Sequence, residues 1–141
     1  MPEPEHLETV IIGGGQAGLS VGHHLARRGR PFLILDANQR VGDAWRNRWD
    51  SLRLFTPARY NALAGLPFPA PAHSFSTKDQ VADYLEAYAT RFQLPVRTGV
   101  RVDRLWRDDG RLVVAAGDQG VKLQTFVVSV TAHKDSADPK S

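Results

Sequence analysis

The apolar residues near the start of the chain mark two short strands with a helix between them. Residues 10–12, Val-Ile-Ile, form a β-branched run that is typical of a buried parallel strand. A helix is predicted from about Gln16 to Arg28, where Gly29 ends it. Phe32–Leu35 is predicted to be a second strand, which ends at Asp36. This order predicts the strand-helix-strand unit of an α/β fold.

The segment from Ala37 to about Ser76 shows little periodicity. A structureless stretch this long inside a compact domain is usually functional. A short helix is expected at Asp43–Arg48. We expect the aromatic residues of the segment to act as apolar anchors, so that it is ordered irregular chain; they are Trp45, Trp49, Phe55, Tyr60, Phe68 and Phe75.

An amphipathic helix is predicted from Lys78 to about Phe92. Thr77 and Gln80 have the spacing of a capping box at its start, and Pro95 confirms that it has ended. One helical face carries apolar residues, which we interpret as core; they are Val81, Tyr84, Leu85, Tyr88 and Phe92.

The period changes to two after this helix. Residues 100–105 and 111–116 alternate, with turns at 108–110 and 117–120, and 121–125 is predicted to pair back. Residues 126–131 are predicted to be another buried strand of the parallel sheet. The whole predicts an α/β domain over 9–133, with a parallel sheet and an inserted antiparallel β-meander. Residues 1–8 are expected to be an N-terminal tail and 134–141 a disordered tail.

Composition narrows the class of protein. The 141 residues allow one domain, and a hydrophobic content of 42% is that of a globular chain. The absence of cysteine excludes disulfides and thiolate chemistry. No apolar run reaches membrane-spanning length and no secretory signal is evident, so a cytoplasmic location is expected. The net charge of +3 comes with interspersed acids, which favours solvated arginine faces over nucleic-acid binding.

A glycine motif, G-x-G-x-x-G, lies where the first strand turns into the helix. Gly13 permits the tight turn, Gly15 lets a pyrophosphate approach the backbone, and Gly18 lets helix and strand pack closely. Gln16 and Ala17 begin the helix, whose N–H groups and dipole point at that pyrophosphate. The alternative is a glycine turn without a ligand.

Asp36 lies about twenty residues beyond the glycines, at the end of the second strand. A carboxylate there can accept hydrogen bonds from a ribose 2′-hydroxyl and would repel a 2′-phosphate. NAD and the ADP half of FAD both remain possible at this point.

The remaining chemistry-bearing residues identify no catalytic group. Each histidine is interpreted as structural or at the surface; they are His6, His23, His24, His73 and His133. No pair has metal-ligand spacing, and no nucleophile-elbow pattern occurs.

Several motifs together resemble the flavin-containing monooxygenases, most closely bacterial members related to the Baeyer–Villiger and indole-pyruvate-type enzymes. They are GGGQAGL, the acid at Asp36, RVGDAW, RNRWDSLRLFTPARY and PFPAPAHSFSTKDQVADYLEAYA. The resemblance covers the chain from Thr9 to about His133. It implies a Rossmann-like FAD-binding domain, with FAD as the cofactor and NADPH as the reductant in the full-length family.

The resemblance also implies further cofactor contacts. The segment that matches Arg40, Ala44 and Trp45 lies along the cofactor in the family. Thr56 matches a position near the flavin end, and Val102 matches a strand whose backbone meets the adenine.

The chain departs from the family in three respects. Where the family has an alanine-threonine-glycine step, the chain reads Val130-Thr131-Ala132. The second glycine motif, for NADPH, and the C-terminal segment that completes the FAD site are absent. We therefore expect an apparently truncated, NAD(P)H-dependent monooxygenase-type flavoprotein whose catalytic competence, substrate and oligomeric state are open. The alternatives are a non-catalytic nucleotide-binding remnant and a single NAD-binding module.

Overall fold

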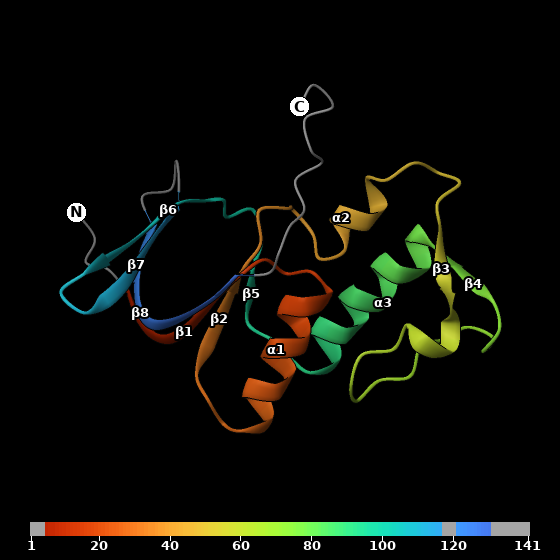
Figure 1. Ribbon diagram of the computed structural model, residues 1–141, viewed down its shortest axis with the longest axis horizontal. Coiled ribbons are helices and arrows are strands. Elements are labelled where there is room, and N and C mark those ends of the chain that lie inside the picture. The colour runs from red at the N-terminus through yellow and green to blue at the C-terminus, as the bar shows by residue number, and fades with distance from the viewer. Residues whose placement is uncertain (1–4, 117–120, 131–141) are drawn as a thin grey trace.

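A six-stranded sheet, two longer helices and a small second sheet make up the fold (Figure 1). The computed structural model describes residues 5–116 and, for the backbone, 121–130. The strands of the large sheet are β1 (Glu5–Ile12), β2 (Phe32–Leu35), β5 (Val96–Arg97), β6 (Val102–Asp108), β7 (Arg111–Ala116) and β8 (Val121–Val130). The helices are α1 (Gln16–Arg27), α2 (Asp43–Arg46), the 3₁₀ turn η1 (Ala58–Tyr60) and α3 (Lys78–Arg91). The small sheet pairs β3 (Arg53–Pro57) with β4 (Phe75–Thr77).

The parallel part of the sheet confirms the predicted α/β class. The strand order is β5-β2-β1-β8-β7-β6, and β1 runs parallel to both of its neighbours. At its carboxyl end Ile12 lies opposite Leu35 of β2 and Val130 of β8. Since Gly13 and Asp36 directly follow the paired residues Ile12 and Leu35, this register brings the glycine turn and the acid to the same edge.

The C-terminal strands differ from the prediction. Residues 121–125 and 126–130 form one continuous strand, β8, which pairs antiparallel with β7 and parallel with β1. Residues 121–130 contain no glycine or proline, so no turn interrupts the strand. The meander therefore continues the parallel sheet directly. The strand β1 also begins earlier than its apolar run, because Glu5 pairs with Leu123.

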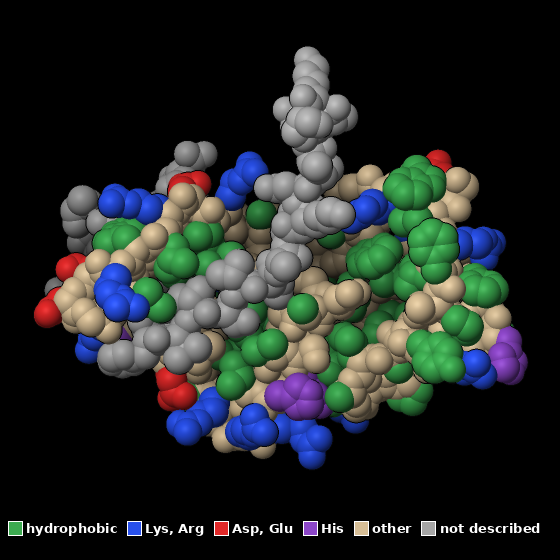
Figure 2. All heavy atoms as spheres, in the orientation of Figure 1, with side chains coloured by type: hydrophobic (Ala, Val, Ile, Leu, Met, Phe, Trp, Pro, Cys, Tyr) green, Lys and Arg blue, Asp and Glu red, His purple; other side chains and the backbone are tan. Residues whose placement is uncertain are grey.

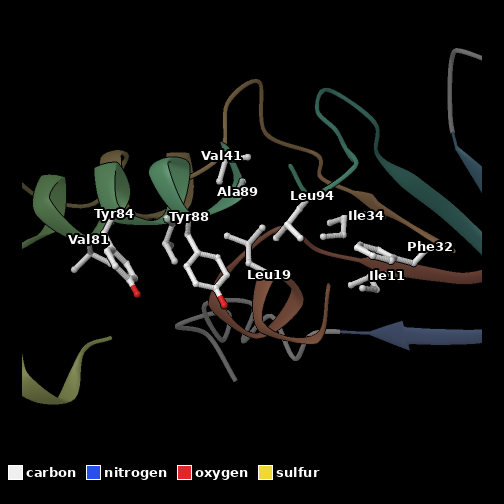
Figure 3. Close-up of a cluster of buried hydrophobic side chains, with 11 residues drawn as sticks. Ile11, Leu19, Phe32, Ile34, Val41, Val81, Tyr84, Tyr88, Ala89 and Leu94 are labelled. Atoms are coloured by element: carbon white, nitrogen blue, oxygen red, sulfur yellow. The ribbon is translucent and has the colours of Figure 1, made fainter. Parts of the chain in front are cut away.

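Two apolar clusters cover the two faces of the sheet. On one face Ile11, Phe32 and Ile34 pack against Leu19 of α1 and Tyr88 of α3 (Figure 3). The second cluster joins residues of β1 and β2 to residues of β7 and of the segment before β6; its members are Val10, Leu33, Leu35, Val100, Val114 and Ala116. Adjacent strand residues alternate between the clusters, as the pleat requires.

The helix α3 confirms its predicted start and buried stripe. The Thr77 hydroxyl accepts from the backbone N–H of Gln80 at 3.2 Å, and the side-chain oxygen Oε1 of Gln80 accepts from the backbone N–H of Thr77 at 2.8 Å. The predicted stripe is buried from Val81 to Tyr88, and Phe92, the residue that caps the helix, packs at its edge.

The segment 37–76 contains more regular structure than its sequence indicates, and the expectation about its aromatic residues was partly wrong. Trp45 and Phe68 pack on the core, but the other four are exposed, with Phe55 97% accessible; they are Trp49, Phe55, Tyr60 and Phe75. Strand alternation explains Phe75, because its neighbour Ser76 takes the buried position. Hydrophobic side chains accordingly gather over the β3–β4 end of the molecule (Figure 2).

Some predictions fall outside the described residues. These are the turn at 117–120, the Thr131-Ala132 step, and the tail at 134–141.

Among the residues that are described, no helix combines the length and the apolar character needed to cross a membrane.

Candidate functional site

The glycine turn has the geometry that its sequence predicts. Gly13 has a φ of 109°, a left-handed value that disfavours a side chain, and its N–H donates to the carbonyl of Leu35 at 2.8 Å. A Cβ on Gly18 would overlap the carbonyl oxygen of Gly13 and lie 3.3 Å from Cγ2 of Ile11. Gly18 therefore lets α1 pack directly on β1.

Gly15, unlike Gly18, is not in close contact with the neighbouring strand. It precedes α1 as the N-cap residue, and a Cβ built on it would meet no atom of the described residues within 4 Å. No side chain caps the helix, and its first turn contains no acidic residue. Gln16 and Ala17 are exposed. The positive end of the α1 dipole consequently faces open space, which is the arrangement that binds a phosphate at a helix N-terminus.

Asp36 is held rigidly beside this turn. Its side chain is 6% exposed, and Oδ1 accepts from the N–H of Asn38 at 3.2 Å and from Nδ2 of the same residue at 3.3 Å. The other oxygen, Oδ2, lies against Gly14, where a Cβ would approach it to 2.7 Å. Neither the hydrogen bonds from Asn38 nor the contact with Gly14 was predicted from the sequence. Asn38 follows the acid by two residues, which is the spacing of an Asx turn and could have been noticed.

The electrostatics of Asp36 are set mainly by burial. Desolvation raises the pKa of this carboxyl above its ordinary value, the hydrogen bonds from Asn38 oppose the rise, and nearby Asp43 adds to it. The Asp36 carboxyl is therefore a buried, partly desolvated hydrogen-bond acceptor, and a hydroxyl group is a suitable donor for it.

A cavity of about 480 Å³ lies beside the first turns of α1. It brings together four of the predicted cofactor residues, Gln16, Ala17, Trp45 and Thr56. Its other walls come from the segment 54–68 and from α3; these residues include Leu54, Asn61, Leu63, Phe68, Tyr84 and Leu85. The lining is mostly apolar with a few polar groups, as in cofactor pockets.

Thr56 is held by a chain of side chains that sequence reasoning missed. Its hydroxyl donates to Oδ1 of Asn61 at 2.6 Å, and Nδ2 of Asn61 donates to Oγ of the fully buried Ser76 at 3.2 Å. The shorter distance suits an O–H donor and the longer an N–H donor. With its proton directed at Asn61, the Thr56 oxygen is left as a hydrogen-bond acceptor.

Trp45 and Ala44 lie on the short helix α2, which a glycine holds against α3. Gly42 has a φ of 95°, and a Cβ there would lie 2.6 Å from the carbonyl oxygen of Ala82. This close approach lets Trp45 pack on the core and line the cavity. Ala44 is exposed and does not line it.

Arg40 lies apart from the cavity. Its guanidinium donates to both carboxylate oxygens of Glu86 on α3, with the Nη2–Oε1 pair at 2.6 Å. Glu86 also lies 3.6 Å from Arg46, whose Nη1 contacts Asp43 at 3.0 Å. A contact between Arg40 and the cofactor, which the resemblance implies, would require this guanidinium to leave Glu86.

Val102, the predicted adenine neighbour, begins β6 close to the acid. The N–H of Val100 donates to the backbone carbonyl of Asp36 at 2.9 Å, and the N–H of Gly99 donates to that of Asn38 at 2.7 Å. These bonds fix the start of β6 beside the end of β2. Asp36 and Val102 therefore lie on the same side of the glycine turn.

A family model described as pyridine nucleotide-disulphide oxidoreductase matches residues 10–132. An uncharacterised CzcO-like oxidoreductase of Geobacillus kaustophilus is 37% identical, with 87% of this chain and 35% of the relative covered. The indole-3-pyruvate monooxygenase YUCCA1 of Oryza sativa subsp. japonica is also 37% identical, with 99% and 36% covered.

Solved structures that resemble this chain also include a flavin-containing monooxygenase. The flavin-containing monooxygenase from Stenotrophomonas maltophilia superposes with a TM-score of 0.84 at 37% identity, covering 90% of this chain and 38% of that one. The chain thus spans little more than a third of the length of each of these relatives. The match over residues 10–132 shows that the chain belongs to the pyridine nucleotide-disulphide oxidoreductase family, with flavin monooxygenases among its relatives.

Proposed function

We propose that this chain binds FAD and forms the FAD-binding part of an NAD(P)H-dependent monooxygenase. One observation carries the proposal. The glycine turn meets the Asp36 carboxylate at Gly14, and the first residues of α1, Gln16 and Ala17, line a cavity of about 480 Å³. A dinucleotide has a pyrophosphate between two larger groups, and this arrangement fits that shape.

The residues divide naturally among the parts of FAD. Gly13, Gly15 and Gly18, with the N–H groups of Gln16 and Ala17, would hold the pyrophosphate. Asp36 would accept from the ribose hydroxyls, and the backbone near Val102 would meet the adenine. Trp45 and Thr56 would face the flavin half in the cavity, with Ala44 and Arg40 alongside.

The cofactor supplies the redox chemistry when it is bound, accepting a hydride and passing electrons to oxygen. The chain's own residues would bind and orient it. Trp45 would form an apolar wall of the cavity, and the Thr56 oxygen would offer an acceptor whose direction is set by Asn61. None of the described residues is assigned as a catalytic acid or base.

The chain spans little more than a third of the length of the relatives compared above and contains one G-x-G-x-x-G motif, which the proposal assigns to FAD. We keep a non-catalytic nucleotide-binding role and NAD binding as alternatives, and a cytoplasmic location as part of the proposal.

Thermal unfolding with different nucleotides separates these alternatives. We expect FAD to raise the Tm, since a ligand at one hundred times its Kd stabilises the folded chain by about 2.7 kcal/mol. A larger rise with NAD⁺ than with FAD would favour the NAD-binding alternative. A folded chain whose Tm responds to neither would contradict nucleotide binding altogether.

A further inference from the structure

His23 is a buried imidazole that the cofactor site does not use. It lies on α1 and is 3% exposed. Its ring centroid is 4.4 Å from that of Phe92 and 5.6 Å from that of Tyr88, both on the α3 side of the core. Neither ring nitrogen has a hydrogen-bond partner among the residues that the structure describes. A buried polar group in this state is costly, and a charged one much more so.

A short piece of chain covers this ring. A Cβ on Gly65 would lie 3.0 Å from Cε1 and 3.3 Å from Nε2 of His23, and Gly65 has a left-handed φ of 94°. We call residues 63–66 the covering segment. Leu63 of this segment also forms part of the cavity wall.

Two tyrosines of α3 hold the covering segment in place. The Tyr84 hydroxyl accepts from the N–H of Leu63 at 2.8 Å and donates to the carbonyl of Leu66 at 2.7 Å. The Tyr88 hydroxyl donates to the carbonyl of Ala64 at 2.7 Å. In Figure 3 both phenol rings extend from α3 in the same direction. The segment is thus tied to α3 and rests on His23.

The charged groups around His23 offer no counter-charge. On α1 its neighbours are His24 and Arg27, and on the α3 side they are the Tyr88 phenol and Arg91, which stacks on Phe92. The covering segment has no titratable side chain. The carboxylates of α3 are engaged elsewhere, Asp79 with Lys78, Asp83 with Arg46, and Glu86 with Arg40.

We propose that His23 makes the cavity wall sensitive to acid, because protonation of its ring displaces the covering segment from α1 and α3. The inference rests on the packing of His23 and stands whether or not the chain binds FAD. Opening would expose the imidazolium to water and remove Leu63 from the wall of the cavity.

The direction of the pH dependence follows from linkage. Burial, followed by His24 and Arg27, lowers the pKa of His23 in the closed arrangement below its ordinary value of 6.5. The open or unfolded form therefore binds the proton more readily. The closed arrangement is stable above about pH 6.5 and loses stability as the pH falls through that value towards the lowered pKa.

Amide hydrogen exchange of the FAD-free chain tests the proposal through the N–H of Leu63. Between pH 7.5 and 5.5 we expect its protection factor, corrected for intrinsic exchange, to fall by up to about tenfold, one pKa unit being tenfold. His23→Phe should keep the protection at both values. His73→Gln, at an exposed position away from His23, should behave as the wild type.

Constant protection in the wild type, or an equal loss in His23→Phe, would overturn the proposal. If His23→Phe does not fold, NMR titration of the His23 ring in the wild type decides. We expect the ring to remain neutral until the Leu63 amide loses protection. Titration near pH 6.5 with that amide still protected would overturn it.

Discussion

Gly14 and Asp36 are in contact across the glycine turn, so closely that a Cβ on Gly14 would lie 2.7 Å from the Asp36 Oδ2 atom. The middle glycine of the turn therefore has a packing role that the motif alone does not assign to it. By its small size it allows the carboxylate to lie beside the backbone that would hold the pyrophosphate. The glycine turn and the acid, the two halves of the proposed nucleotide site, are thus packed directly against each other.

Asp36→Asn should weaken FAD without weakening the free fold. Loss of a charged hydrogen-bond acceptor costs about 1.5–3 kcal/mol, or roughly 10- to 100-fold in Kd. Because burial raises the pKa of Asp36 in the folded chain, the stabilising contribution of its protonated carboxyl group is present at low pH and is lost as the pH rises through the folded pKa. At pH 7 the variant should therefore melt no lower than the wild type.

Fluorescence titration with FAD and thermal melts measure these two effects. Asp50→Asn, at an exposed position, is the matched control and should change neither. An unchanged Kd for Asp36→Asn would remove this residue from the site.

Gly15→Ala and Gly18→Ala should separate binding from folding. Gly15 has a φ of −83° and open surroundings, so alanine there should change stability by about 1 kcal/mol or less while placing a methyl group where the pyrophosphate is expected. Gly18→Ala forces α1 away from β1 and should destabilise by about 1–3 kcal/mol or more. Urea unfolding and FAD titration of both variants test the pair; unimpaired FAD binding by Gly15→Ala would place the pyrophosphate elsewhere.

Tyr88→Phe should lower the stability and flatten its alkaline pH dependence. Removing the bond to Ala64 costs about 0.5–1.5 kcal/mol at neutral pH. Burial, with a smaller contribution from Tyr84, raises the pKa of Tyr88 from 10.0 to about 12. The stability that depends on this neutral phenol is complete below about pH 10 and is lost as the pH rises through about 12.

Urea unfolding at pH 8, 10 and 11 measures that dependence. The exposed Tyr60→Phe is the control. If Tyr88→Phe loses stability at alkaline pH as steeply as the wild type, the buried phenol is not the group responsible.

Asn61→Ala should affect both stability and the cavity. It leaves the buried Ser76 hydroxyl without its observed partner, at a cost of about 1–3 kcal/mol, and frees the Thr56 proton to reorient. We expect a lower Tm and weaker FAD binding, whereas Asn47→Ala, at an exposed position, should have neither effect. Unchanged binding by a destabilised Asn61→Ala would confine the chain of side chains to a structural role.

Local sequence signals predicted the geometry of the glycine turn well, because the conformation of Gly13 and the close packing at Gly18 depend on short-range structure that the motif encodes directly. The capping box at Thr77 and the stripe around Tyr84 were predicted for the same reason. Nucleotide binding by the glycines and by Asp36 stays a prediction.

Long-range relationships were not predictable. Arg40 pairs with Glu86, forty-six residues away, and Ser76 reaches Asn61 across the β3–β4 sheet. The exposure of Phe55 depends on which side of an irregular strand it occupies. Such contacts depend on tertiary packing, and no local pattern near these residues encodes them.

The central claim is that this chain binds FAD at the N-terminus of α1, and a fluorescence titration tests it most directly. FAD is titrated into the purified chain and into Gly15→Ala, with circular dichroism confirming that both are folded. The account predicts saturable one-to-one binding by the wild type and at least about tenfold weaker binding by the variant, a difference of 1.4 kcal/mol. A folded wild-type chain that shows no saturable binding would contradict it.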